Sequence, residues 1–107
     1  MPDRELVAYR ALPAWQARLA AAHTISRESR AEQHTPFDPD LAAGITVPTL
    51  LLIGGDSPDF IKADSETVAA ALPDARIQVI EGQQHIALDL VPGVFADYVV
   101  AFLRDQR

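Results

Sequence analysis

An unbroken apolar run at residues 49–53, Thr-Leu-Leu-Leu-Ile, constrains the fold of this 107-residue chain more than any other feature. Pro48 precedes the run, and Gly54 and Gly55 follow it. A short apolar run between turn residues is typical of a β-strand with both faces covered, as in a parallel sheet that has helices on either side. We therefore expect a strand here, in a fold of the α/β class.

The segments after this run alternate between helix and strand. A helix is predicted over residues 63–72, where Pro73 ends it, and a second strand over residues 76–80. At residues 92–104 the apolar side chains recur on one face, with the spacing of an amphipathic helix. Strand, helix and strand at this spacing predict a right-handed βαβ unit with parallel strands, followed by a C-terminal helix.

The first third of the chain has helical patterns. Pro13 suits the first turn of a helix, and Trp15, Leu19 and Ala22 then fall on one face of it. A second helix, polar and rich in Arg and Glu, is expected over residues 26–33. Such a pair has little to bury, so we expect it to be peripheral.

A turn-rich connector at residues 35–40, Thr-Pro-Phe-Asp-Pro-Asp, divides the chain. We expect a helical segment with its connector at residues 1–44 and the strand-helix-strand-helix part at residues 45–107. Two parallel strands alone do not make a stable sheet, and an unpaired strand edge is a template for association. The chain is therefore expected either to form a homodimer or to pair with strands of an upstream segment, and the isolated chain is not expected to be a stable monomer.

The charge and composition exclude several classes of function. Nine Lys and Arg against fifteen Asp and Glu give a net charge of −6, which disfavours nucleic-acid binding. Cysteine is absent, which excludes disulfides and cysteine-based metal sites. The apolar stretch at residues 45–55 is far shorter than the roughly 20 residues of a membrane-spanning helix, and no signal peptide is visible. We expect a cytoplasmic protein that binds neither nucleic acid nor membrane.

Two polar loops follow the predicted strands. Gly-Gly-Asp-Ser-Pro-Asp at residues 54–59 follows the first strand, and Glu-Gly-Gln-Gln-His at residues 81–85 follows the second. In open parallel sheets the functional groups gather at the carboxyl ends of the strands. These two loops are therefore the candidate site.

Together these segments resemble the C-terminal segment of the α/β-hydrolase-fold enzymes. The resemblance rests on the strand with its Gly-Gly-Asp-Ser-Pro turn at residues 54–58, the helix and second strand, Gly-Gln-Gln-His at residues 82–85, and the apolar terminal helix. It covers roughly residues 45–103, while residues 1–44 resemble the end of the family's helical cap. The resemblance implies a partial α/β-hydrolase fold with the last two strands and the last two helices.

The resemblance also implies two catalytic roles. His85 falls at the position of the family's catalytic histidine, and an imidazole can take up and return a proton near neutral pH. The family's acidic turn reads Gly-x-x-Asp-Pro, whereas here Ser57 takes the place of the aspartate and Asp56 precedes it. Either Asp56 completes the triad or the acid lies on a strand upstream of this chain.

The family's nucleophile is absent from this sequence. It stands in a Gly-x-Ser-x-Gly elbow, and no such pentapeptide occurs here. We interpret Ser57 as a turn residue rather than a nucleophile. His23 and His34, eleven residues apart, lack the spacing of metal ligands, and no metal or organic cofactor is implied.

The sequence therefore predicts the C-terminal part of a serine-hydrolase-type enzyme that transfers the acyl group of a small ester-like substrate to water. His85 would act first as general base and then as general acid. The isolated chain, which lacks the nucleophile, is predicted to be inactive. The alternative is a non-catalytic, self-associating interaction module derived from a truncated hydrolase.

Overall fold

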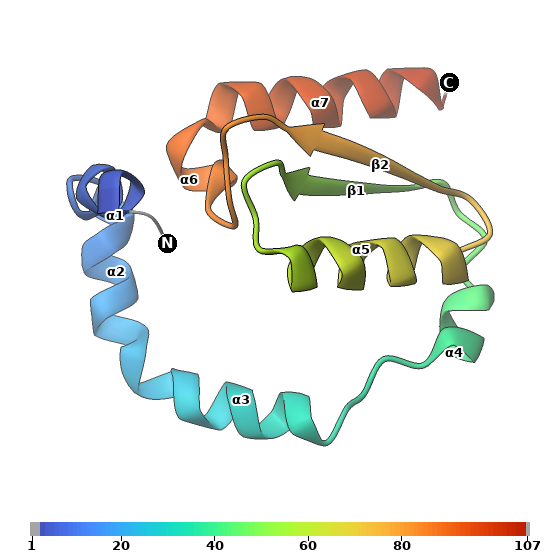
Figure 1. Ribbon diagram of the computed structural model, residues 1–107, viewed down its shortest axis with the longest axis horizontal. Coiled ribbons are helices and arrows are strands. Elements are labelled where there is room, and N and C mark those ends of the chain that lie inside the picture. The colour runs from blue at the N-terminus through green and yellow to red at the C-terminus, as the bar shows by residue number, and fades with distance from the viewer. Residues whose placement is uncertain (1–2, 107) are drawn as a thin grey trace. The chain divides into compact units, whose positions relative to one another are not determined.

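The computed structural model describes residues 3–106, and the chain divides into two units, Met1–Phe37 and Asp38–Arg107. The first unit is helical, and the second contains two strands with helices around them (Figure 1). The helices of the first unit are α1 (Asp3–Arg10), α2 (Pro13–Ala21), a short 3₁₀ helix η1 (Ala22–Thr24) and α3 (Ile25–Gln33). The second unit contains α4 (Pro39–Ala43), β1 (Thr49–Gly54), α5 (Asp59–Ala71), β2 (Ala75–Ile80), α6 (Ala87–Leu90) and α7 (Pro92–Asp105).

An aromatic cluster joins α1 to α2 in the first unit. The rings of Tyr9 and Trp15 meet edge to face, with centroids 5.8 Å apart and planes at 79°. The guanidinium of Arg10 lies 5.3 Å from the Trp15 ring centroid, and that of Arg18 lies 5.6 Å from the Tyr9 ring centroid. Neither α2 nor α3 contains a buried residue, as expected for helices with little to bury.

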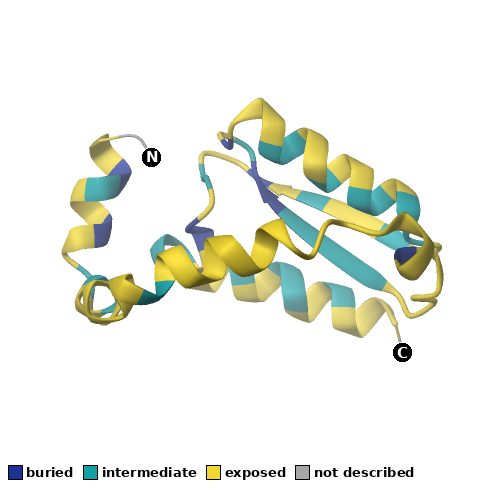
Figure 2. Cartoon of the chain, turned by 90° about the horizontal axis from the view of Figure 1, so that it is seen from below, coloured by how far each residue is buried: buried dark blue, intermediate teal, exposed yellow. Residues whose placement is uncertain are grey.

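The two strands of the second unit form the predicted parallel pair. Their register runs from Thr49 opposite Ala75 to Gly54 opposite Ile80, and α5 connects them. Helices α5 and α7 lie on opposite sides of the strands (Figures 1 and 2). The α/β class, the strand-helix-strand unit and the C-terminal helix are thus confirmed.

Three details differ from the expectations drawn from sequence. Helix α5 begins at Asp59, one turn before the predicted start, because Pro58 has the extended backbone that precedes a helix. Part of the expected connector is the short helix α4, since the carboxylate of Asp38 accepts a hydrogen bond of 2.9 Å from the N–H of Asp40 and caps it. Helices α1 and α6 carry no clear apolar periodicity and were not expected.

Strand β1 is only partly covered by other parts of the chain. Leu50, Leu51 and Leu52 are half-buried, although the apolar run was expected to be covered on both faces. Apart from Ala42, the buried residues of the second unit gather at the carboxyl ends of the strands and in the loops that follow (Figure 2). Within residues 3–106, no helix is both long and apolar enough to cross a membrane.

Candidate functional site

The loops that follow β1 and β2 are hydrogen-bonded to each other. The N–H of Gly55 donates to the carbonyl of Ile80 at 2.8 Å, and the N–H of Asp56 donates to the carbonyl of Gln83 at 2.9 Å. Because the strands are parallel, both loops leave the sheet at the same end. The structure therefore brings the segments of Asp56 and His85 together, as the sequence predicts.

Gly54 allows this close approach. A Cβ atom at this position would lie 2.5 Å from the carbonyl oxygens of both Gln83 and Gln84, which is far inside normal contact. Only glycine lets the end of β1 run this close to the backbone of the second loop. The segment before His85 is thereby packed directly on the end of β1.

Gly82 is required for a different reason. Its φ of +72° lies in the left-handed region, and a Cβ built there would meet nothing within 4 Å. The turn at residues 81–82 thus depends on the backbone freedom of glycine rather than on space. Past this turn, Ile86 and Ala87 are each only 6% exposed and anchor the chain directly after His85.

A cavity of about 400 Å³ lies at this end of the sheet. His85 lines it, and Ser57, which is 5% exposed, lines it as well. Among the described residues His85 is the one ionisable side chain that contributes to its wall. The remaining lining residues are uncharged: Leu52, Ile53, Gly54, Ile61, Ser65, Ile80, Gln84, Ala87, Leu88 and Phe95.

Asp56 is exposed and is not among the residues that line the cavity. Ser57, the next residue, occupies the place in the turn where the α/β-hydrolase resemblance puts the acid, and it is Ser57 that lines the cavity with His85. From the sequence, Ser57 was interpreted as a turn residue. Its alignment with the family's aspartate was the signal that could have assigned it to the cavity that His85 lines. The catalytic roles of His85 and Asp56 stay predictions.

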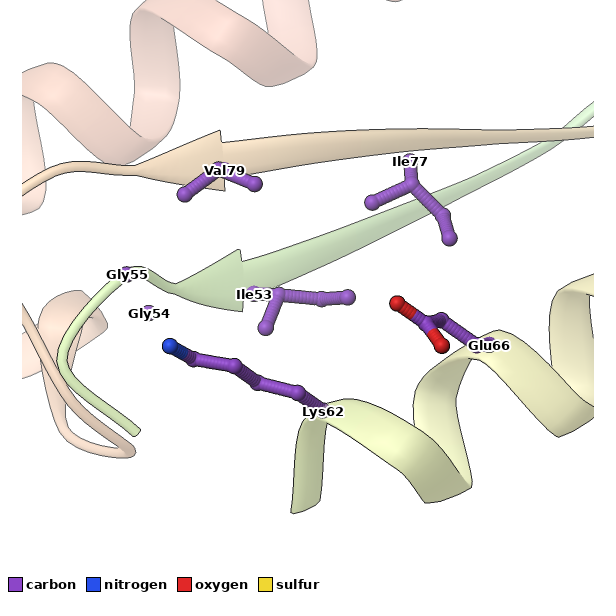
Figure 3. Close-up of a pocket in the computed structure, with 7 residues that line it drawn as sticks. All are labelled: Ile53, Gly54, Gly55, Lys62, Glu66, Ile77 and Val79. Atoms are coloured by element: carbon purple, nitrogen blue, oxygen red, sulfur yellow. The ribbon is translucent and has the colours of Figure 1, made fainter. Parts of the chain in front are cut away.

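A second, smaller hollow of about 140 Å³ lies between α5 and the strands (Figure 3). Ile53, Ile77 and Val79 form its apolar floor, and Lys62 and Glu66, from successive turns of α5, flank it. It contains neither histidine nor serine. Nowhere in residues 3–106 do three His, Asp or Glu side chains gather so that they could hold a metal ion.

Comparisons with known proteins support the fold. No protein-family model matches this sequence, and no curated protein matches it. Among solved structures, the chain is similar to the crystal structure of an alpha/beta hydrolase from Sphaerobacter thermophilus DSM 20745, with a TM-score of 0.72 and 27% sequence identity. The match covers 96% of this chain and 39% of that hydrolase, so the chain spans about two fifths of the related structure. The chain therefore has part of the α/β-hydrolase fold, and the resemblance drawn from its two loops is confirmed.

Proposed function

We propose that this chain supplies the catalytic histidine of an α/β-hydrolase-type enzyme that hydrolyses small ester-like substrates. The observation that carries the proposal is the position of His85 as the one ionisable side chain among the described residues that line the cavity at the carboxyl ends of β1 and β2. The similarity to a solved alpha/beta hydrolase supports the same class of enzyme.

The proposed chemistry follows from the imidazole. One ring nitrogen of His85 accepts the proton of a nucleophilic hydroxyl as that oxygen attacks the ester carbonyl. The same nitrogen then returns the proton to the leaving alcohol. Water, activated by His85 in the same way, releases the acid. The uncharged wall that Leu88 and Phe95 help to form would suit an apolar acyl group.

The nucleophile and the oxyanion donors have to come from other parts of a hydrolase fold. This sequence contains no Gly-x-Ser-x-Gly, and the related structure has 61% of its length outside the match (100 minus 39). The acid is either Asp56, whose backbone is held against the second loop, or a carboxylate from those other parts.

A chimera tests the proposal. Residues 3–106 replace the matching part of the S. thermophilus hydrolase, and the hydrolysis of a nitrophenyl ester that the parent hydrolase turns over is measured. We expect His85→Ala to lower kcat/KM by about 10²–10⁴-fold, the usual contribution of a general base. His34→Ala, a control at an exposed histidine outside the cavity, should leave the rate unchanged.

The same chimera distinguishes the two candidates for the acid. If Asp56 holds the imidazole, Asp56→Asn lowers kcat/KM by several orders of magnitude, because the imidazole loses the group that fixes its tautomer and orientation. If the acid lies elsewhere, Asp56→Asn has little effect. A folded, active chimera that retains its rate in the His85→Ala variant would overturn the proposed function.

The second candidate function is a non-catalytic module that associates with itself. One observation favours it. Within the described residues β1 pairs only with β2, so the other edge of β1 has no strand beside it. If this alternative holds, the chimera folds but does not hydrolyse the nitrophenyl ester, with or without the His85→Ala substitution.

A further inference from the structure

The side chain of Ser57 is buried, yet its hydroxyl has no hydrogen-bond partner among residues 3–106. The residue is 5% exposed, and its backbone is fixed, because its N–H donates to the carbonyl of Gly54 at 3.0 Å. No described residue forms a hydrogen bond with the hydroxyl itself. Buried polar groups in folded proteins are nearly always paired, and each exception requires an explanation. The hydroxyl of Ser57 is therefore available to bind another molecule.

Ser57 lines the cavity of about 400 Å³ that His85 also lines. The other hydroxyl of this wall, that of Ser65, is already paired, since it donates to the carbonyl of Ile61 at 2.9 Å. Gln84 lines the cavity too, and its side-chain amide forms no hydrogen bond with another described residue. A molecule that enters the cavity therefore meets two unpaired, uncharged polar groups beside the imidazole.

These unpaired groups define the chemistry that the cavity can recognise. A serine hydroxyl offers one donor and accepts as well, so the ligand group that satisfies it fully is itself a hydroxyl. A carboxylate or an ammonium does not fit, because His85 has to be neutral to act as a base and no other ionisable side chain of the described residues lines the cavity. The rest of the wall is mainly apolar, which suits a hydrocarbon chain.

We propose that Ser57 determines the substrate specificity of the site: its hydroxyl binds a hydroxyl group carried by the otherwise apolar acyl part of the ester. The inference rests on the proposed function of His85 and names the substrate class of that same site. The same position explains why a buried hydroxyl is left unpaired, since binding residues are often retained at some cost in stability.

The first test measures the stability of the full chain. Ser57→Ala removes a buried hydroxyl that no described residue pairs with, so the urea midpoint should stay unchanged or rise at a fixed chain concentration. A lower midpoint would show that the hydroxyl has a structural partner in the folded chain and would overturn the inference.

The second test measures specificity in the chimera with the S. thermophilus hydrolase. The substrates are nitrophenyl esters of straight-chain acids that differ only in the position of one hydroxyl group, with the plain ester as reference. For at least one hydroxy ester, Ser57→Ala should lower kcat/KM relative to the plain ester by about three- to ten-fold, the usual contribution of one hydrogen bond between uncharged groups. Ser65→Ala is the matched control, and it should leave every ratio unchanged because the Ser65 hydroxyl is already bonded.

Two outcomes of the second test would overturn the inference. One is an active Ser57→Ala chimera with the same ratios as its parent. The other is an equal loss for all esters, which would place the hydroxyl in contact with the imidazole rather than with the substrate.

The inference and the proposed function fail in different experiments. Activity that survives in His85→Ala refutes the role of the histidine, whatever the ratios are. Where turnover is absent, binding of the same esters to the folded chimera is followed by NMR titration. The hydroxy ester that Ser57 recognises should then bind about three- to ten-fold more weakly after Ser57→Ala, and equal binding of all esters before and after the substitution would overturn the inference.

Discussion

Replacement of Gly54 by alanine should push apart the two loops of the candidate site. The new Cβ would lie 2.5 Å from two carbonyl oxygens, whereas ordinary contact begins at 3.4 Å, so the second loop has to retreat by about 0.9 Å (3.4 minus 2.5). A retreat of this size stretches the 2.9 Å hydrogen bond from Asp56 to Gln83 beyond the usual limit of about 3.2 Å. The loop that carries His85 would then no longer pack on the end of β1.

Three contributions determine how far Gly54→Ala changes the free energy of unfolding. Overpacking costs about 1–3 kcal/mol and the lost hydrogen bond about 0.5–1.5 kcal/mol, while the reduced freedom of the unfolded chain contributes about 0.4–1 kcal/mol in the opposite direction. We expect Gly54→Ala to lower the free energy of unfolding by about 2 kcal/mol. Gly93→Ala is the matched control: its Cβ meets nothing within 4 Å in the first turn of α7, so it should be neutral or stabilising.

Urea unfolding, followed by far-ultraviolet circular dichroism, measures both variants. The chain concentration has to be the same throughout, because self-association makes stability depend on concentration. The NMR signals of the His85 ring provide a local readout, and they should shift in Gly54→Ala and stay in place in Gly93→Ala. A Gly54→Ala chain as stable as the parent, with an unchanged denaturant slope, would refute the reasoning about the close approach.

Three further predictions concern the isolated chain. It should not hydrolyse short-chain nitrophenyl esters, because it has no nucleophile elbow; turnover that disappears in Ser57→Ala would contradict this and make Ser57 a nucleophile. Gly82→Ala should lower the free energy of unfolding by about 1–2 kcal/mol, since alanine is strained at a φ of +72°; an unchanged urea midpoint would show that the turn relaxes. Asp38→Ala should cost about 1 kcal/mol through loss of the α4 cap, and Asp38→Asn, which keeps the cap, should cost less in the same titration.

The helices and strands that could be predicted are those with a clear apolar pattern or with a residue, such as proline, that ends a helix. The apolar run at residues 49–53 and the helix at residues 92–104 were assigned within one residue of the observed ends of β1 and α7. The strand at residues 76–80 lies within β2, which begins one residue earlier. Pro73 cannot extend a helix, and α5 accordingly ends before it, at Ala71.

The unpredicted parts depend on local capping and on tertiary contact. Helix α4 has five residues, too few for any periodicity, and it exists because the Asp38 carboxylate and Pro39 start it. For the site, the sequence indicated that the two loops would meet. It did not indicate that the second loop would lie on Gly54, or that Ser57 rather than Asp56 would line the cavity with His85. Both features depend on how the turn at residues 54–59 packs against the loop at residues 81–85, and a sequence pattern does not specify that packing.

The aromatic cluster of the first unit has a practical consequence for spectroscopy. Trp15 is the only tryptophan of the chain, and its ring contacts Tyr9 and Arg10, both within residues 1–37. Its fluorescence therefore reports on the helical unit, while the exchange of the β1 amides reports on the sheet. Thermal unfolding followed by Trp15 fluorescence and by exchange of the β1 amides would reveal whether the whole chain unfolds in one cooperative transition or whether α1 and α2 unfold at a different temperature from the sheet.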